Sequence, residues 1–396
     1  MRVILFTGKG GVGKTTTAAA TAALAATRGI KTLVLSTDPA HSLGDALGVP
    51  LTGEPTEVEP GLFGQQVDAQ ARFEQSWTEI SGYLSRLLDA SGVDPLEAEE
   101  IAVLPGAEEV LALLEVLAQA RSGRFELIIV DCAPTAETLR LLALPEALSW
   151  YMDRVFPMER RLVKTLRPVL TRMTGGMPMP RDDVFAAVER LHGDLREVRA
   201  LLTDAERASV RLVLTPEAVV VAEARRTLTS LALYGYRVDA VVANRLIPTG
   251  GADEWRDGWV KSQAVQMTEV RASFSPLPIL TAPYRPSEPV GIEALVAHGG
   301  ELYAEVDPVR LPPGEDPMVV TRTPTGFELR LALPLADPTA VDLKRRGDDL
   351  VVTVGGQRRV LSLPVALRKA TIAGAKLRDG GLVVRFESEP VARRSE

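Results

Sequence analysis

The sequence contains very few of the residues that build disulfides and metal clusters. Its 396 residues include one cysteine, Cys132, and three histidines. A single thiol forms neither an intrachain disulfide nor a paired-thiolate zinc site. His41, His192 and His298 do not have the spacing of a metal site either. We therefore expect no zinc in this chain, and a reducing compartment suits it.

Basic charge and long hydrophobic runs are also missing. Lysine and arginine total 45 against 52 aspartates and glutamates, which gives a net charge of −7. Such a chain has no basic face to neutralise nucleic-acid phosphates. Charges interrupt even the apolar segment Arg211 to Ala224, so no run reaches the ~20 residues that span a bilayer. The apolar residues 2–6 are too few for a signal-peptide core. We expect a cytoplasmic protein with no nucleic-acid partner and no membrane-spanning segment.

Short apolar segments alternate with helical patterns over residues 1–307. Hydrophobic residues make up 46% of the chain and aromatic residues 5%, which is typical of a folded protein rich in Ala, Leu and Val. The apolar segments are residues 2–6, 31–36, 127–131, 211–215 and 239–244. Strands that are apolar on both faces indicate a buried parallel sheet. Helices are expected from Thr15 to Arg28 and from Pro216 to Leu233, with proline in the first turn of the second. We predict one α/β domain with a mostly parallel sheet flanked by helices.

A helical insertion is expected at about residues 150–203. Methionines surround its central loop, and one helix carries a narrow apolar seam. The seam consists of Val184, Val188, Leu191, Leu195, Val198 and Leu202. Two interpretations are open: the seam packs inward, which is the more common outcome, or it is an exposed surface for a client or partner.

The chain changes character after residue 307. Residues 308–317 carry four prolines and are predicted to be a linker. Residues 318–388 consist of short alternating strands separated by Gly- and Asp-containing turns, which predicts an all-β sandwich. Residues 389–396 form a tail.

A phosphate-binding loop lies between the first strand and the first helix. The Walker A pattern consists of Gly8, Lys9, Gly10, Gly11, Val12, Gly13, Lys14 and Thr15, followed by Thr16. Glycines let backbone N–H groups converge on phosphates at a helix N-terminus, Lys14 adds charge, and Thr15 offers a hydroxyl to Mg²⁺. The loop predicts a P-loop NTPase that binds ATP and Mg²⁺, and we expect no other metal.

Two aspartates lie at strand ends. Asp38 follows the second strand, where a carboxylate can orient the attacking water, although a helix cap is the alternative. Asp131 ends a later strand, where it can hold Mg²⁺ through water. These positions make Asp38 and Lys14 candidate catalytic residues, and Thr15 and Asp131 the candidate metal ligands; Lys9 joins the catalytic candidates through the resemblance described next.

The motifs resemble those of one ATPase family. Lys9 is the extra lysine of the deviant Walker A class. Residues 36–43 and 131–142 resemble the first and second switches of the ArsA and tail-anchored-protein-targeting (guided entry) ATPases, and residues 215–217 and 241–245 continue the match. Ala136 and Glu137 depart from the family pattern, because glycine often stands at the first and histidine in eukaryotic members at the second.

This resemblance implies several roles. Lys9 would reach the phosphates bound by a partner subunit, so hydrolysis would require a homodimer. Asn244 would contact adenine, and Pro283 and Tyr284 would begin the loop that covers the base. The arsenite site of the pump ATPases needs several cysteines, so arsenite binding and an arsenite-pump role are disfavoured.

The C-terminal strands resemble the α-crystallin domain of small heat-shock proteins. The segments that carry this resemblance are residues 326–334, 348–354 and 377–385. Bacterial members of the targeting-ATPase family carry such an appendage.

Together these features predict a homodimeric Mg-ATPase that couples ATP to capture or release of a hydrophobic client, such as a helix of a membrane-protein precursor. The alternatives are a chaperone-like or partner-regulating ATPase without such cargo, and a non-enzymatic nucleotide sensor.

Overall fold

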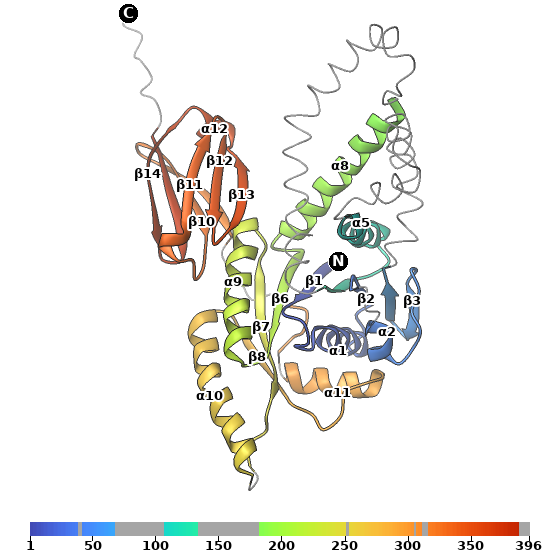
Figure 1. The fold of residues 1–396 in the computed structure, drawn as a ribbon. Helices are drawn as coiled ribbons and strands as arrows, with labels where there is room; N and C mark the ends of the chain where they lie inside the picture. The colour runs from blue at the N-terminus through green and yellow to red at the C-terminus, as the bar shows by residue number, and fades with distance from the viewer. Residues whose placement is uncertain are drawn as a thin grey trace, which may run out of the picture.

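The structure, a computed structural model, contains a larger α/β unit and a smaller all-β unit (Figure 1). It describes residues 1–38, 42–67, 107–133, 182–250, 253–304, 306–310 and 316–387, without the side chains of 107–110 and 182–188.

An eight-stranded sheet forms the centre of the larger unit, in the order β3-β4-β2-β5-β1-β6-β7-β8. Its strands are β1 (Arg2–Thr7), β2 (Thr32–Ser36), β3 (Thr56–Glu59), β4 (Leu62–Gln66), β5 (Leu127–Asp131), β6 (Ala208–Leu214), β7 (Val238–Leu246) and β8 (Ile279–Pro283). Only the edge strand β3 is antiparallel to its neighbour. The mostly parallel sheet that the sequence predicts is therefore confirmed.

Helices cover both faces of this sheet. They are α1 (Lys14–Thr27), α2 (Ser42–Leu47), α5 (Ala107–Ser122), α8 (Asp182–Thr203), α9 (Ala218–Tyr234), α10 (Glu254–Phe274) and α11 (Ile292–Tyr303). Figure 1 shows α1 and α11 on one side of the sheet and α5 and α8 on the other. The helix α9 begins after the N-cap Glu217, so Pro216 precedes the cap and is not in the first turn.

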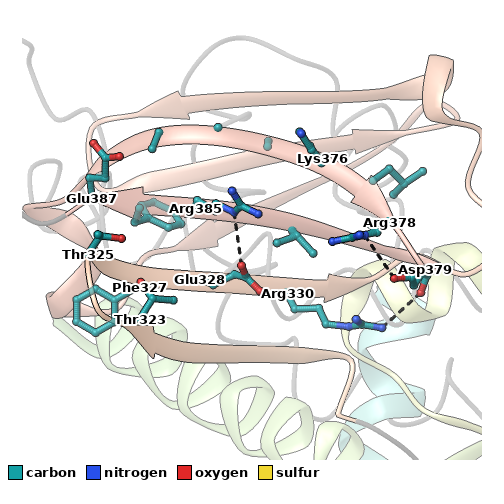
Figure 2. Close-up of a pocket in the computed structure, with 16 residues that line it drawn as sticks. Thr323, Thr325, Phe327, Glu328, Arg330, Lys376, Arg378, Asp379, Arg385 and Glu387 are labelled. Atoms are coloured by element: carbon teal, nitrogen blue, oxygen red, sulfur yellow. Dashed lines mark hydrogen bonds and ion pairs between the residues drawn. The ribbon is translucent and has the colours of Figure 1, made fainter.

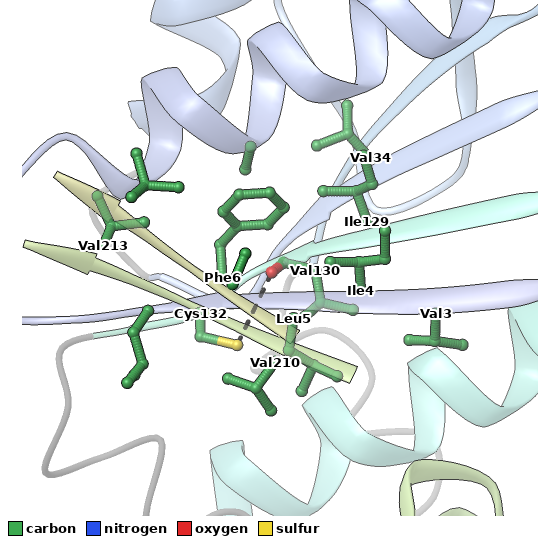
Figure 3. Close-up of a cluster of buried hydrophobic side chains, with 14 of the residues drawn as sticks. Val3, Ile4, Leu5, Phe6, Val34, Ile129, Val130, Cys132, Val210 and Val213 are labelled. Atoms are coloured by element: carbon green, nitrogen blue, oxygen red, sulfur yellow. Dashed lines mark hydrogen bonds between the residues drawn. The ribbon is translucent and has the colours of Figure 1, made fainter. Parts of the chain in front are cut away.

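The alanine-rich sequence of α1 suits its position between the sheet and α11. A Cβ added to Gly299 of α11 would lie 2.7 Å from the carbonyl oxygen of Ala20 in α1, so the two helices approach closely. Figure 3 shows the apolar side chains of the central strands, among them Ile4 and Ile129, which are fully buried. The thiol of Cys132 is buried there and donates to the carbonyl oxygen of Val130 at 3.8 Å.

The described part of the apolar seam on α8 packs inward. Leu195, Val198 and Leu202 are buried in the core of the larger unit, and Leu191 is partly buried against it. The helix packs on α5 and β6. The side chains of Val184 and Val188, and the methionine-rich segment before α8, lie outside the described residues.

The smaller unit consists of two antiparallel sheets with a shared apolar core. One sheet has the order β14-β15-β10-β9, and the other has the order β11-β12-β13. The elements are β9 (Met318–Thr323), β10 (Gly326–Ala332), a 3-10 turn (Pro338–Ala340), β11 (Val341–Arg346), β12 (Asp349–Val354), β13 (Gln357–Ser362), α12 (Val365–Arg368), β14 (Thr371–Arg378) and β15 (Gly381–Glu387). Both sheets contribute to the core, with Leu331 and Phe386 from one and Leu350 and Leu361 from the other. An all-β sandwich is the result.

The two units also make direct contacts. Leu233 at the end of α9 is fully buried in the core of the sandwich. The Thr229 hydroxyl donates to the carbonyl oxygen of Pro334 at 2.6 Å, and the buried Arg359 guanidinium donates to the carbonyl oxygen of Leu233. The expected linker begins inside packed structure, because Pro308 is buried; residues 311–315 lie outside the described residues.

A buried polar network crosses the larger unit. Arg211 of β6 donates from Nε and Nη2 to the two carboxylate oxygens of Asp239 in β7, at 3.2 Å each. Its Nη1 donates to the Tyr303 hydroxyl of α11 at 2.8 Å, and that hydroxyl lies 2.7 Å from the Thr21 hydroxyl of α1. Both charged side chains are almost fully buried, so each depends on the other for compensation.

Replacing Asp239 with asparagine should therefore destabilise the larger unit. The Asp239→Asn variant leaves the charge of Arg211 buried without a counter-charge, which costs about 3–5 kcal/mol. Urea unfolding measures the change. Glu269→Gln is the control, since Glu269 forms an ion pair with Arg225 at 2.6 Å in which both side chains are more than 40% exposed. Its loss should cost less than about 1 kcal/mol. Equal effects would contradict the importance of the buried pair.

Candidate nucleotide-binding site

The register of three parallel strands brings the candidate residues to one edge of the sheet. In register, Asp131 of β5 lies between Phe6 of β1 and Ser36 of β2. The Thr37 N–H donates to the carbonyl oxygen of Asp131 at 3.0 Å, and the Cys132 N–H donates to that of Phe6 at 3.1 Å. Three features therefore meet at this edge: the glycine loop after β1, the segment after β2 that ends in Asp38, and Asp131 itself.

The glycines of the loop are required by contacts and backbone geometry. A Cβ on Gly8 would lie 2.1 Å from the carbonyl oxygen of Val213 in β6, so the loop leaves β1 in close contact with its neighbour. Gly13 has φ 91°, a left-handed conformation that favours glycine, and it is the N-cap of α1. Lys14 is buried, and its ammonium group donates to the carbonyl oxygen of Lys9 at 3.4 Å. The loop is thus folded as a cradle at a helix N-terminus, an arrangement that binds phosphate.

Hydroxyl groups and a buried carboxylate lie together beside the loop. The Thr15 hydroxyl lies 3.2 Å from the Ser42 hydroxyl of α2, and the Ser36 hydroxyl donates to Asp131 Oδ2 at 3.4 Å. Asp131 Oδ1 is buried and has no hydrogen-bond partner among the described residues. Burial raises the pKa of Asp131 to about 7, against the opposing effects of the Thr15 hydroxyl and the Lys14 ammonium.

This cluster fits Mg²⁺. Mg²⁺ prefers hard oxygen ligands and uses one or two carboxylates together with waters and substrate phosphates. An unpartnered buried carboxylate oxygen near the Thr15 hydroxyl supplies such ligands, and a bound cation would keep Asp131 ionised. Across the described residues, no group of three or more His, Cys, Asp or Glu side chains forms a metal cluster, in keeping with a site that relies on few protein carboxylates.

Asp38 and Lys9 lie at the same edge. Two hydrogen bonds fix the Asp38 backbone. Its N–H donates to the Ser36 hydroxyl at 3.2 Å, and its carbonyl oxygen accepts from Gln66 Nε2 at 2.9 Å. Both Asp38 and Lys9 are half-buried. The Lys9 ammonium has no partner among the described residues. Residues 39–41, Ala136 and Glu137 lie outside the described residues.

The end of β7 contacts the phosphate-binding loop directly. Asn244 Nδ2 donates to the carbonyl oxygen of Val12 at 2.9 Å, and Asn244 Oδ1 accepts from the N–H of Arg245 at 2.9 Å. Arg245 Nη1 donates to the carbonyl oxygen of Gly11 at 2.8 Å. A Cβ on Gly13 would lie 2.3 Å from Asn244 Nδ2. The sequence singled out Asn244 only for contact with a base, and these contacts to the loop were not predicted.

Pro283 and Tyr284 lie beside this strand end. Pro283 pairs with Leu246 in the register of β7 and β8, and the Tyr284 N–H donates to the carbonyl oxygen of Leu246 at 2.7 Å. The Tyr284 side chain is 56% exposed. Both residues therefore lie beside the end of β7, the strand that carries Asn244.

Sequence comparisons agree with this geometry. Residues 1–304 match the family described as "Anion-transporting ATPase", and residues 324–386 match the "HSP20-like domain found in ArsA". The chain belongs to the ArsA ATPase family. The sandwich therefore corresponds to the HSP20-like domain, and the chain is an ATPase of this family.

Relatives from distant organisms share nearly the whole chain. A Chlorobaculum tepidum protein, provisionally named arsenical pump-driving ATPase, is 36% identical over 391 residues, which cover 98% of this chain and 96% of the relative. Protein Rv2184c of Mycobacterium tuberculosis is 39% identical over 419 residues, with 98% and 96% covered. The ATPase ASNA1 homolog of Trypanosoma cruzi is 30% identical over 314 residues, with 73% of this chain and 87% of the relative covered.

A second concave surface lies on the HSP20-like domain of this ArsA-family chain. It has a volume of about 1010 Å³ and covers the outer face of β9, β10, β14 and β15 (Figure 2). Some of its charges pair within the surface, since Arg385 Nε lies 3.7 Å from Glu328 Oε2 and Arg378 Nε lies 3.7 Å from Asp379 Oδ2. No residue of the phosphate-binding loop lines it. No helix in the described segments is long and apolar enough to cross a membrane.

Replacing Gly13 with alanine should abolish nucleotide binding without unfolding the chain. The new Cβ meets Asn244 Nδ2 at 2.3 Å, and alanine is strained at φ 91°. Calorimetric titration with ATP measures the affinity, and circular dichroism checks the fold. Gly193→Ala on α8 is the matched control, because its Cβ meets no atom within 4 Å. Unchanged ATP affinity in Gly13→Ala would contradict the assignment of the loop.

Proposed function

We propose that this ArsA-family ATPase is a Mg-ATP-driven homodimer that couples nucleotide binding and hydrolysis to the capture and release of a hydrophobic client. The observation that carries the proposal is the convergence of the glycine loop, Asp38 and Asp131 at one edge of the sheet. A phosphate cradle, a water-orienting carboxylate and a metal-binding carboxylate are the parts that ATP hydrolysis requires.

Each group has a role that its position supports. The N–H groups of the loop and the buried Lys14 bind the phosphates, and Lys14 stabilises the negative charge that develops on them. Thr15 and Asp131 would hold Mg²⁺, which would supply positive charge to the phosphates when bound. Asp38 orients the attacking water from its half-buried position at the end of β2. Asn244 contacts the base, and Pro283 and Tyr284 border it.

The homodimer is proposed from Lys9. Lys9 lies in the phosphate-binding loop, and its ammonium group has no partner among the described residues. Its carbonyl oxygen accepts a hydrogen bond from Lys14 Nζ. If a second copy packed against this edge, the Lys9 ammonium of one subunit would contact the nucleotide phosphates bound by the other. Each site would then be complete only in the dimer.

Lys9→Ala should abolish turnover and leave ATP binding nearly unchanged. A cation supplied in trans to a transferring phosphoryl group is worth about 10³-fold or more in rate. Phosphate release measures turnover, and calorimetry measures ATP affinity. Lys261→Ala on the exposed face of α10 is the control.

Mixing variants tests whether Lys9 acts in trans. Lys9→Ala and Asp38→Asn subunits should each be inactive alone. In a mixed dimer, the site that keeps Asp38 receives Lys9 from its partner, so mixing should restore turnover. A mixture that stays inactive although mixed dimers form contradicts action in trans.

A second candidate, a chaperone-like or partner-regulating ATPase without membrane-protein cargo, is favoured by one observation. The described part of the α8 seam is buried in the core, so Leu195, Val198 and Leu202 offer no client surface. An arsenite-pump role is disfavoured because the chain has one cysteine, and its thiol is buried. A nucleotide sensor without hydrolysis is opposed by the family assignment.

Gel filtration with a single hydrophobic transmembrane segment separates the two candidates. The client proposal expects co-elution with Mg-ATP that weakens with Mg-ADP. Removing residues 150–181, which precede α8, should abolish co-elution while ATPase activity continues. Absence of co-elution in both nucleotides, with ATPase activity intact, supports regulation through a folded partner instead.

A further inference from the structure

The helix α10 carries one polar side chain at the end of its buried apolar stripe. Met267, Val270 and Phe274 are each at most 3% exposed and pack into the core of the larger unit. Gln263 continues the stripe one turn toward the N-terminus and is 8% exposed. Packing of the three apolar residues fixes the rotation of α10, and thereby the position of the Gln263 amide.

Both ends of the Gln263 amide bind the backbone at the C-terminal end of β7. Its Nε2 donates to the carbonyl oxygen of Arg245 at 3.1 Å, and its Oε1 accepts from the N–H of Ile247 at 2.8 Å. The backbone groups settle which end of the amide is which, because a carbonyl requires a donor and an N–H requires an acceptor. Burying an amide is unfavourable unless both ends are satisfied, and here both are.

The backbone that Gln263 holds is strained, and it lies where the register of β7 with β8 shifts between Ala243 and Leu246. Arg245 has φ 58°, in the left-handed region that a side chain disfavours. Such a conformation persists only where surrounding contacts enforce it. The Arg245 N–H donates to Asn244 Oδ1, so the backbone at Arg245 also fixes the Asn244 side chain.

The orientation of Asn244 leaves a defined pattern for a base. Its amide has two donors and two lone pairs, of which Val12 and Arg245 occupy one each. One N–H and one lone pair remain. Adenine offers the complementary pair, an N7 acceptor and an N6 donor, whereas guanine offers two acceptors, N7 and O6. In this orientation, the free N–H and lone pair of Asn244 would complement the N7 and N6 groups of adenine, but not the N7 and O6 groups of guanine.

We propose that Gln263 is a positioning residue for adenine specificity: by holding the Arg245 backbone from α10, it keeps the Asn244 amide in the orientation that complements adenine. The inference rests on the proposed role of Asn244 in an ATP site. Gln263 itself touches no ligand in this scheme and acts through Arg245 and Asn244.

The test compares Gln263→Leu with Gln266→Leu, the same substitution one turn along α10 at a half-buried position. For each variant, kcat/KM is measured with ATP and with GTP. Gln263→Leu should lower the ATP-to-GTP ratio about tenfold, since a good bidentate contact to a base is worth that or more. The loss should appear in KM for ATP, with kcat nearly unchanged, because phosphate chemistry is untouched. Gln266→Leu should keep the wild-type ratio.

A second variant and a binding measurement separate a loss of base discrimination from misfolding of Gln263→Leu. Gln263→Glu keeps an acceptor for the Ile247 N–H but has no N–H for the Arg245 carbonyl, so it should show the same loss of discrimination. The ratio of ADP to GDP affinity, measured by calorimetry, should fall in parallel. A folded Gln263 variant with wild-type ATP-to-GTP and ADP-to-GDP ratios overturns the inference. A wild-type chain that does not hydrolyse ATP contradicts the proposed function instead, and the ADP-to-GDP ratio still tests Gln263.

Discussion

The parallel pairing of β5 with β1 and β2 is the constraint on which the rest of the site depends. A slip of one residue would turn Asp131 to the opposite face of the sheet, because side chains alternate along a strand. The same slip would also shift Asp131 along the sheet relative to the glycine loop after β1 and the Asp38 segment after β2. Apolar side chains on both faces of β1, β2 and β5 bury these strands in the core, so the hydrophobic core carries the polar groups at the strand ends.

A polar chain links the core to the phosphate-binding loop. From Asp239 it runs through Arg211 and the Tyr303 hydroxyl to the Thr21 hydroxyl, which also donates to the carbonyl oxygen of Thr17 at 2.7 Å. The Thr17 hydroxyl then donates to the carbonyl oxygen of Gly13 at 2.7 Å. Each hydroxyl acts in a medium of low dielectric, where an unpaired group is costly. The start of α1 is therefore fixed by satisfied polar contacts as well as by packing.

The sequence predicted those parts of the structure that local patterns encode. The glycine loop and the apolar segments of β1, β2, β5, β6 and β7 are each a continuous stretch of sequence, so periodicity and spacing reveal them and their motif context. The contact of Arg245 with Gly11 and that of Gln263 with Arg245 could not be predicted in this way. A glutamine on a helix resembles any surface glutamine until the rotation of α10 is known. Pro216 shows the same limit at the start of a helix. The sequence placed it in the first turn of α9, but the backbone geometry makes Glu217 the N-cap residue.

The attachment of the HSP20-like domain to α9 concerns the same site. The strands before and after α9 both contact the phosphate-binding loop, β6 through the Val213 carbonyl beside Gly8 and β7 through Asn244. The sandwich encloses Leu233 at the end of α9, and its buried Arg359 donates to the Leu233 carbonyl. A proline-rich linker alone would let the sandwich move freely, whereas a buried joint makes α9 and the sandwich move together. Because α9 also connects β6 to β7, the sandwich is joined through one helix to the two strands that contact the loop.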